Sequence, residues 1–436
     1  MGHLGRLKQE YRDLLARLER GPVALPEPDD ERAREGLREI LEILYTPEDA
    51  ALAARMPVRP TSLERLAARL GVPADALAAR LEPMCDRGVV LDLVHPRTGK
   101  RTYMLSPPVV GFFEYSLMRA RDGIPKKRMA EALHAYTEGD PAFAREAFGH
   151  DTVIGRALVH EPRLGDEALP DVLAWERASD VVGGARRWAV SLCFCRHKAQ
   201  HLGEACDAPM DTCLSLNSGA EFVIRRGFGR AIDKAEAMDL LVRSRESGLV
   251  QIADNVKSRP TFMCNCCGCC CEQLQAVTRW GVQAVNPSGF VPRHDPGACA
   301  GCSRCARACP VGAIAMEPRR ERAERRNALV PRVDEARCIG CGVCANACRK
   351  GALAMVRGGR PRPVPANGVE RVVRMAIERN RLAELLLDDG AGLGERFLHR
   401  ALDAIVRLPP AQALLASEQV RSRFVAAAVR RFGGSS

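Results

Sequence analysis

The chain has 436 residues, a formal net charge of +11, 46 % hydrophobic residues and 27 % charged residues. This length and composition predict two to four folded domains and exclude a largely disordered chain. No apolar run approaches the roughly 20 residues of a membrane helix, so we expect no membrane insertion. The charged N-terminal segment lacks the apolar stretch of a signal peptide, so we expect a cytoplasmic protein.

The N-terminal part of the chain predicts helices followed by a β-hairpin. Residues 1–34 are expected to form a polar helix and a proline-rich linker. In residues 35–106, helices are expected to start after Thr46 and Ser62, which are both good N-caps, and two β-rich runs follow them. This order of elements resembles a winged helix-turn-helix, so we expect a winged-helix-like domain here.

A winged-helix-like domain can bind DNA, but the charges of this one do not favour DNA binding. The helix predicted over residues 74–87 carries two arginines against three acidic residues, whereas a helix that reads the major groove normally brings positive charge. The predicted hairpin is more basic, with His95, Arg97, Lys100 and Arg101. We therefore favour a structural or docking role for residues 35–106.

Two further segments are expected to be mainly helical, namely a connector over residues 107–185 and a tail over residues 369–436. The connector contains His134, His150 and His160, and none of them has a partner at metal-ligand spacing. Each of these histidines is therefore expected to be an ordinary surface or core residue.

The most informative feature is the set of 19 cysteines, of which fourteen lie between Cys264 and Cys348. In a chain without an export signal, clustered thiols indicate metal ligands rather than disulfides. Cys85 lies apart from the others on a predicted helix, and we expect it to be a small core residue.

Two cysteine runs in residues 286–357 share the spacing C-x2-C-x2-C-x3-C. Three thiolates at this spacing bind one cubane, and the fourth points to the neighbouring cluster. The repeat therefore predicts two [4Fe–4S] clusters that exchange one ligand. The first cluster is expected to be bound by Cys299, Cys302, Cys305 and Cys348. The second is expected to be bound by Cys338, Cys341, Cys344 and Cys309.

The segment from about residue 290 to residue 357 resembles the bacterial-type 2[4Fe–4S] ferredoxin domain. The resemblance implies a ferredoxin-like dicluster fold with internal pseudo-symmetry and one-electron transfer. The chain departs from the family's pattern in two ways: Arg349 replaces the proline after the second run, and 28 residues separate Cys309 from Cys338. We expect the arginines at 319–326 in this insert to lie on a solvated loop, with docking of an acidic partner as the alternative.

Ten more cysteines lie upstream, in a Cys-rich α/β region at residues 186–285. They are Cys193, Cys195, Cys206, Cys213, Cys264, Cys266, Cys267, Cys269, Cys270 and Cys271. The C-x-C-R and N-C-C-x-C-C-C segments that carry most of them resemble those of ferredoxin-type iron–sulfur proteins of anaerobic bacteria and archaea. So many soft ligands favour a third iron–sulfur cluster, with zinc or a redox-active thiol site as the alternative. The spacing does not decide which of the ten bind metal.

The sequence therefore predicts an α+β multidomain iron–sulfur protein that exchanges single electrons with redox partner proteins. One alternative is a redox-responsive winged-helix regulator. Another is an oxidoreductase with a catalytic centre between Cys193 and Cys271. The sequence shows no Ser-His-Asp set, phosphate loop, or nicotinamide or flavin fingerprint, so we favour an electron carrier or oxidoreductase component over a stand-alone enzyme.

Overall fold

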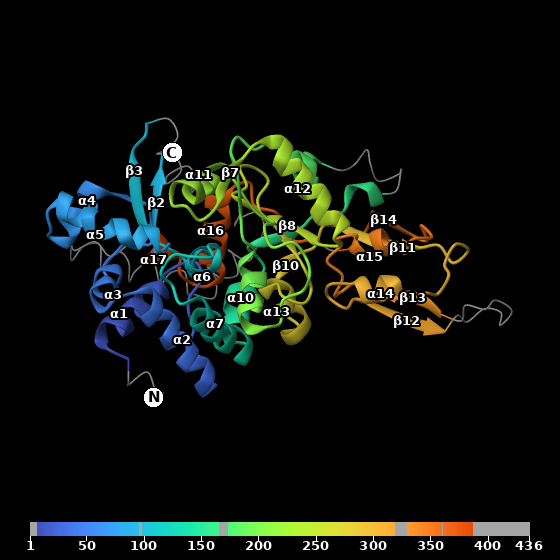
Figure 1. The fold of residues 1–436 in the computed structure, drawn as a ribbon, viewed down its shortest axis with the longest axis horizontal. Coiled ribbons are helices and arrows are strands. Elements are labelled where there is room, and N and C mark those ends of the chain that lie inside the picture. The colour runs from blue at the N-terminus through green and yellow to red at the C-terminus, as the bar shows by residue number, and fades with distance from the viewer. Residues whose placement is uncertain (1–6, 96–97, 165–172, 319–328, 360, 387–436) are drawn as a thin grey trace, which may run out of the picture. The chain divides into compact units, whose positions relative to one another are not determined.

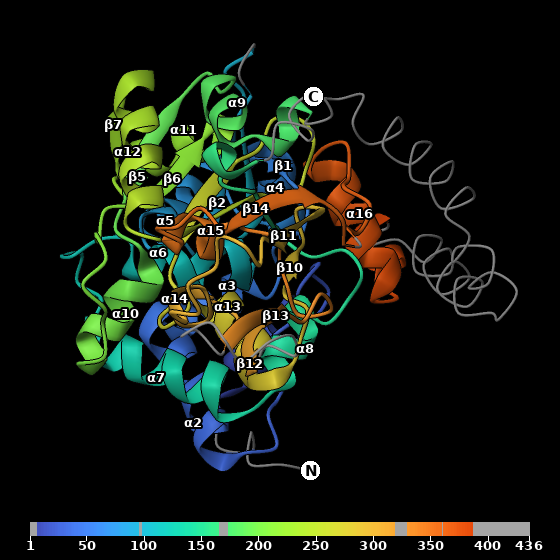
Figure 2. The same ribbon diagram turned by 90° about the vertical axis from the view of Figure 1, so that its right-hand side faces the viewer.

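The computed structural model describes residues 7–95, 98–164, 173–318, 329–359 and 361–386. These residues form two compact units (Figures 1 and 2). Unit 1 contains the described parts of residues 1–152, 225–228 and 365–436. Unit 2 contains the described parts of residues 153–224 and 229–364. The mixture of helices and sheets confirms the α+β prediction.

Unit 1 begins with five helices and a small sheet. The helices are α1 (Gln9–Leu18), α2 (Glu31–Leu44), α3 (Pro47–Ala53), α4 (Leu63–Leu70) and α5 (Ala74–Asp86). The strands β1 (Thr61–Ser62), β2 (Val90–Val94) and β3 (Arg101–Leu105) form an antiparallel sheet in the order β1-β3-β2. The predicted helix starts are confirmed, because the side chains of Thr46 and Ser62 accept hydrogen bonds from the first turns of α3 and α4.

The remaining helices of unit 1 pack around an aromatic core. They are α6 (Phe113–Leu117), α7 (Lys126–Gly139), α8 (Ala142–Phe148), α16 (Gly368–Glu378) and α17 (Leu382–Leu386). Phe113, Tyr136 and Phe143 contact one another with ring centroids 5.3–6.2 Å apart. Helices α2 and α7 approach closely at Gly36, where a Cβ would lie 2.6 Å from the Ala132 carbonyl oxygen. The rest of the predicted helical tail, beyond residue 386, lies outside the described residues.

Unit 2 contains a seven-stranded sheet in the order β10-β4-β8-β9-β6-β5-β7. Its strands are β4 (Gly155–Ala157), β5 (Trp188–Ser191), β6 (Cys213–Leu216), β7 (Arg230–Ile232), β8 (Val250–Asp254), β9 (Phe262–Cys266) and β10 (Val285–Asn286). All neighbours are antiparallel except β10 and β4. Strand β4 comes from the connector that was expected to be mainly helical. The connector therefore also contributes one strand to the sheet, between β10 and β8.

Five helices accompany this sheet. They are α9 (Ala178–Gly183), α10 (Phe194–Leu202), α11 (Asn217–Arg225), α12 (Lys234–Glu246) and α13 (Glu272–Trp280). Val182 of α9 and Leu240 of α12 belong to one buried cluster with Leu214 and Met263 of the sheet. Burial of these side chains provides the hydrophobic stabilisation of this half of the unit.

The last part of unit 2, drawn in orange in Figure 1, is built from two similar halves. The first contains β11 (Phe290–His294), α14 (Arg304–Ala308) and β12 (Ile314–Pro318). The second contains β13 (Leu329–Val333), α15 (Val343–Ala347) and β14 (Leu353–Arg357). The pairs β11–β14 and β12–β13 are antiparallel, so each two-stranded sheet takes one strand from each half. No helix in the described part of the chain is long and apolar enough to cross a membrane.

Candidate iron–sulfur site

The two halves of the orange segment are related by a constant offset. Cys299 and Cys338 are 338 − 299 = 39 residues apart, and the same offset relates Met316 to Met355. The repeat extends upstream of the cysteines, because Val291-Pro292-Arg293 recurs as Val330-Pro331-Arg332. Pro292 pairs with Met355 and Pro331 with Met316 in the two sheets. Sequence reasoning found the cysteine runs and missed this upstream repeat, although its signal is visible in the sequence.

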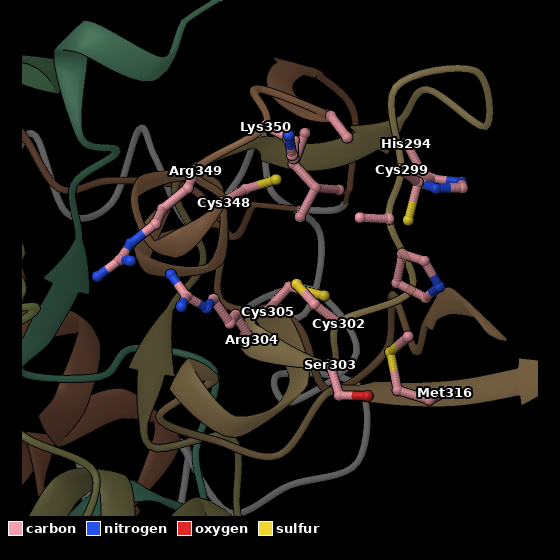
Figure 3. Close-up of a pocket in the computed structure, with 14 residues that line it drawn as sticks. His294, Cys299, Cys302, Ser303, Arg304, Cys305, Met316, Cys348, Arg349 and Lys350 are labelled. Carbon is pink, nitrogen blue, oxygen red and sulfur yellow. The ribbon is translucent and has the colours of Figure 1, made fainter. Parts of the chain in front are cut away.

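One cavity, of about 240 Å³, is lined by the four cysteines that were predicted to bind the first cluster. They are Cys299, Cys302, Cys305 and Cys348. Figure 3 shows their sulfur atoms around a common space. Cys348 follows α15 and so reaches this cavity from the second half. The Met316–Pro331 pair and the basic residues Arg304, Arg349 and Lys350 also line the cavity.

A second, smaller cavity is lined by the four cysteines that were predicted to bind the second cluster. They are Cys309, Cys338, Cys341 and Cys344. Here Cys309 comes from the first half, and the Pro292–Met355 pair takes the place of Met316 and Pro331. Cys341 and Cys344 are buried, whereas Cys302 of the first cavity is exposed. The two sites therefore have similar construction but different access to solvent.

Backbone N–H groups approach sulfur atoms of both cavities. The N–H of Gly301 donates to Cys299 Sγ at 3.4 Å, and that of Ala313 donates to Cys309 Sγ at 3.2 Å. The loop that places Gly301 needs a positive φ of 61°, and the matching Gly340 has a φ of 70°. N–H···S hydrogen bonds stabilise thiolates and are one of the means by which proteins set cluster potentials.

Burial opposes ionisation of the inner thiols. It raises the pKa of Cys341 well above its ordinary value, and it raises that of Cys344 to about 12. A thiol must lose its proton to bind iron, so metal binding at these positions releases protons. The donor set of eight thiols in two groups of four, with N–H donors beside them, fits two iron–sulfur clusters in chemical type.

The comparison with protein families supports this interpretation. The family model described as a 4Fe-4S dicluster domain matches residues 298–352. These residues are a ferredoxin-type 4Fe–4S domain, as the sequence predicted, and the chain is an iron–sulfur protein. Comparisons with curated proteins and with solved structures gave no match.

The ten upstream cysteines all lie in unit 2 and form two groups of thiols. The four-thiol group consists of Cys206, Cys267, Cys269 and Cys270, whose Sγ atoms all lie within 4.8 Å of one another. The six-thiol group consists of Cys193, Cys195, Cys213, Cys264, Cys266 and Cys271. The two groups are neighbours, because Cys195 and Cys270 belong to one buried cluster.

Strand register brings part of the six-thiol group together. Leu214 of β6 pairs with Met263 of β9, so the antiparallel register places Cys213 opposite Cys264. Cys264 and Cys266 are two residues apart on β9 and therefore share a face. Hydrogen bonds continue from Cys266 to Cys271, from Cys271 to Cys195, and from Cys195 to Cys193. The bond with Cys195 is the main cause that lowers the pKa of Cys271 well below its ordinary value.

Arg196 joins the two cysteine segments. Its side chain is fully buried, and its guanidinium donates to the Asn265 carbonyl oxygen at 3.2 Å, to Thr212 Oγ1 and to Cys267 Sγ at 3.7 Å. None of these partners is a carboxylate. Arg196 is the arginine of the C-x-C-R segment, and Asn265 is the asparagine of the N-C-C segment. From the sequence alone, neither residue had been assigned a role. Their contact shows that the two segments form one structural feature.

The remaining candidate residues line neither cavity, although the backbone N–H of His160 donates to the Cys341 carbonyl oxygen at 3.0 Å. His160 is buried in the core of unit 2, where its Nε2 lies 3.0 Å from the Leu249 carbonyl oxygen, and burial lowers its pKa to about 4. His134 Nδ1 lies 3.1 Å from a carboxylate oxygen of Glu138 on α7. Cys85 is buried in unit 1, as predicted, and burial raises its pKa to about 12.

The helix proposed to read DNA is engaged in contacts within unit 1. Glu82 and Asp86 of α5 form ion pairs with the buried Arg226, which also binds Asp92 of β2. Arg80 donates to the Glu48 carbonyl oxygen. The predicted hairpin residue Arg97 and the insert arginines at 319–326 lie outside the described residues. The contacts of α5 thus favour a structural role for this helix, and the winged-helix assignment stays a prediction.

Proposed function

We propose that this iron–sulfur protein transfers single electrons through two [4Fe–4S] clusters with exchanged ligands. One cluster is bound by Cys299, Cys302, Cys305 and Cys348. The other is bound by Cys338, Cys341, Cys344 and Cys309. The observation that supports this proposal is the pair of cavities, each lined by three cysteines of one half and the fourth cysteine of the other half.

The two sites would play different parts in this transfer. A [4Fe–4S] cluster gains or loses one electron at a time when it is bound. The first site has the exposed Cys302, so electrons would enter or leave there. The exposed side chains of Arg349 and Lys350 lie beside this site and would attract an acidic surface on a redox partner. The buried thiols Cys341 and Cys344 would keep the second cluster away from water.

Metal and sulfide analysis with electron paramagnetic resonance tests this function. Anaerobically purified protein should contain about 8 iron and about 8 sulfide ions per chain for the two clusters, in addition to any third centre. After reduction, it should show two interacting S = ½ signals. A chain without sulfide, or with zinc in place of iron at these cysteines, would overturn the proposal.

Two serine variants test the exchange of ligands. Cys348→Ser should perturb the cluster of the first half, although Cys348 belongs to the second cysteine run. Cys309→Ser should perturb the cluster of the second half. Mössbauer spectra of the two variants, compared with those of Cys302→Ser and Cys341→Ser, would show which pairs affect the same cluster. Pairing of Cys348 with Cys341 would contradict the proposed ligand sets.

The six-thiol group is the place that we propose for the third iron–sulfur centre. Its cysteines come from the start of α10, from β6 and β9, and from the residue before α13. Their six sulfur atoms do not form one compact set of ligand atoms. In the part of the chain that the structure describes, only the four-thiol group has three or more candidate ligand atoms within 4.8 Å of one another. The six thiols form a row of neighbours, and a cluster, in which each thiolate binds a different iron, suits ligands that are spread in this way.

A further inference from the structure

The four-thiol group has the dimensions of a site for one metal ion. Its Sγ atoms are 3.6 Å apart between Cys206 and Cys267, 3.9 Å between Cys206 and Cys270, and 3.7 Å between Cys269 and Cys270. A tetrahedral ion with metal–sulfur bonds of about 2.3 Å places its ligands about 3.8 Å apart. We propose that these four thiolates bind a single tetrahedral metal ion, either Zn²⁺ or Fe²⁺, separate from the iron–sulfur clusters.

The dicluster domain provides an internal comparison for this spacing. Its eight cysteines are all described, and none of them belongs to a group of three or more ligand atoms close enough to hold one metal ion. Cubane ligands stand farther apart because the cluster itself lies between them. The four-thiol group is tighter than either set of cubane ligands in the same chain. Its spacing therefore favours a mononuclear centre over a third cubane at these four positions.

The local sequence is also suited to a single ion. Cys267 and Cys270 form a C-x-x-C pair, which is typical of one side of a tetrahedral thiolate site. Cys206 comes from the loop after α10 and closes the site from another part of the chain. The N–H of Cys270 donates to the sulfur of Cys267, and the N–H of Cys206 donates to the sulfur of Cys270. Such donors stabilise ligand thiolates.

Arg196 indicates negative charge among the upstream thiols, and its guanidinium donates a hydrogen bond to a thiol of the four-thiol group. A buried guanidinium is costly unless a negative group lies near it, and the described contacts of Arg196 include no carboxylate. The groups near it that can carry negative charge are thiols: Cys267, whose sulfur accepts a hydrogen bond at 3.7 Å, and Cys193 and Cys266 of the six-thiol group. Four thiolates around a divalent ion have a net charge of −2, and Arg196 would offset part of that charge.

The proposed ion lies beside the dicluster domain. A Cβ on Gly268 would be 2.5 Å from the Pro310 carbonyl oxygen, so the backbone at Gly268 packs directly on Pro310. Gly268 lies between Cys267 and Cys269, and Pro310 follows Cys309. By tying Cys206 to the 267–270 loop, the ion would hold this loop against the second cluster site. An Fe²⁺ ion there would add a redox centre next to that cluster, whereas Zn²⁺ would be structural.

Metal analysis of the full chain, purified anaerobically, tests the proposal. Cys206→Ser and Cys269→Ser should each lose one equivalent of metal with no loss of sulfide, and the reduced dicluster signals should remain. Loss of zinc would identify a zinc site, and loss of iron alone would identify an Fe–S₄ site. The control Cys85→Ala, whose cysteine lies in unit 1, should keep all its metal.

Wild-type protein provides a second measurement in case these variants fail to fold. X-ray absorption at the zinc edge should show four sulfur ligands at about 2.3 Å for a zinc site. For an iron site, Mössbauer spectra should show one high-spin Fe–S₄ ion that is not matched by sulfide. Equal loss of iron and sulfide in both variants would overturn the proposal, as would wild-type protein with neither thiolate-bound zinc nor sulfide-free iron. These outcomes differ from a failure of the dicluster proposal, which is read from the reduced cluster signals.

Discussion

Gly340 lies at the tightest point of the second cysteine loop, and replacing it with alanine should destabilise the second cluster site. Its φ is 70°, and a Cβ there would lie 2.2 Å from Ser288 Oγ and 2.4 Å from the Phe290 carbonyl oxygen. The Ser288 hydroxyl donates to the Gly340 carbonyl oxygen at 2.7 Å, so movement of Ser288 would also break this hydrogen bond. Gly340→Ala therefore combines backbone strain, a steric clash and a lost contact.

The expected cost follows from these three effects. An alanine with positive φ costs about 1–2 kcal/mol. Overpacking against Ser288 and Phe290 adds about 1–3 kcal/mol, and the lost hydrogen bond adds about 1 kcal/mol. Gly351→Ala is a matched control, because Gly351 has a φ of 63° and open space around its Cβ position. The control should be destabilised only by the backbone strain of an alanine at positive φ. Gly340→Ala should therefore be less stable than the control by about 2–4 kcal/mol, the sum of the overpacking and the lost hydrogen bond.

Loss of the cluster chromophore near 400 nm in denaturant, under anaerobic conditions, measures this difference. If the strain is released when the loop opens, Gly340→Ala should lose its second cluster roughly 30-fold to several hundred-fold faster than Gly351→Ala, since about 1.4 kcal/mol corresponds to a factor of ten. The first cluster should be affected much less. Equal rates for the two variants would refute the reasoning, because they would show that the packing around Gly340 contributes nothing.

Three further predictions follow from the described contacts. Arg349→Glu together with Lys350→Glu should slow electron exchange with an acidic redox protein about tenfold or more at low salt and weaken its salt dependence, as stopped-flow measurements would show; an unchanged rate would exclude docking at this face. Arg196→Met should cost about 3 kcal/mol or more and weaken metal binding by the four-thiol group, whereas Arg196→Lys should keep more of the metal, as metal analysis would show; equal retention in both variants would contradict the charge argument. Burial alone would raise the pKa of Asp92, but hydrogen bonds from Arg226 and Arg225 lower it, so its stabilising effect is present above its ordinary pKa and is lost as the pH falls through the folded value. Asp92→Asn should therefore cost about 3 kcal/mol at pH 7 and progressively less as the pH is lowered below 3.8, measured by denaturant unfolding over a pH series; a cost that stays constant below pH 3.8 would refute the ionic explanation.

Local motifs could be interpreted from the sequence because their geometry depends on neighbouring residues. The C-x2-C-x2-C-x3-C spacing places three thiols on one short loop whatever the rest of the chain does, so the family of residues 298–352 was predictable. The starts of α3 and α4 were predictable for the same reason, because a capping hydroxyl bonds to an N–H only three residues away. The Val-Pro-Arg repeat was equally local and was overlooked.

The tertiary structure alone decided how the ten upstream cysteines divide. Cys213 meets Cys264 because β6 and β9 are neighbours in the sheet, and Cys206 meets Cys267 although they are 61 positions apart in the sequence. Strand order and register depend on non-local packing, and a shift of one residue would turn Cys264 and Cys266 to the other face. Adjacent cysteines can therefore belong to different groups: Cys270 lies in the four-thiol group and Cys271 in the six-thiol group. Spacing along the chain carries no information about that separation, which arises only when the strands and loops have assembled.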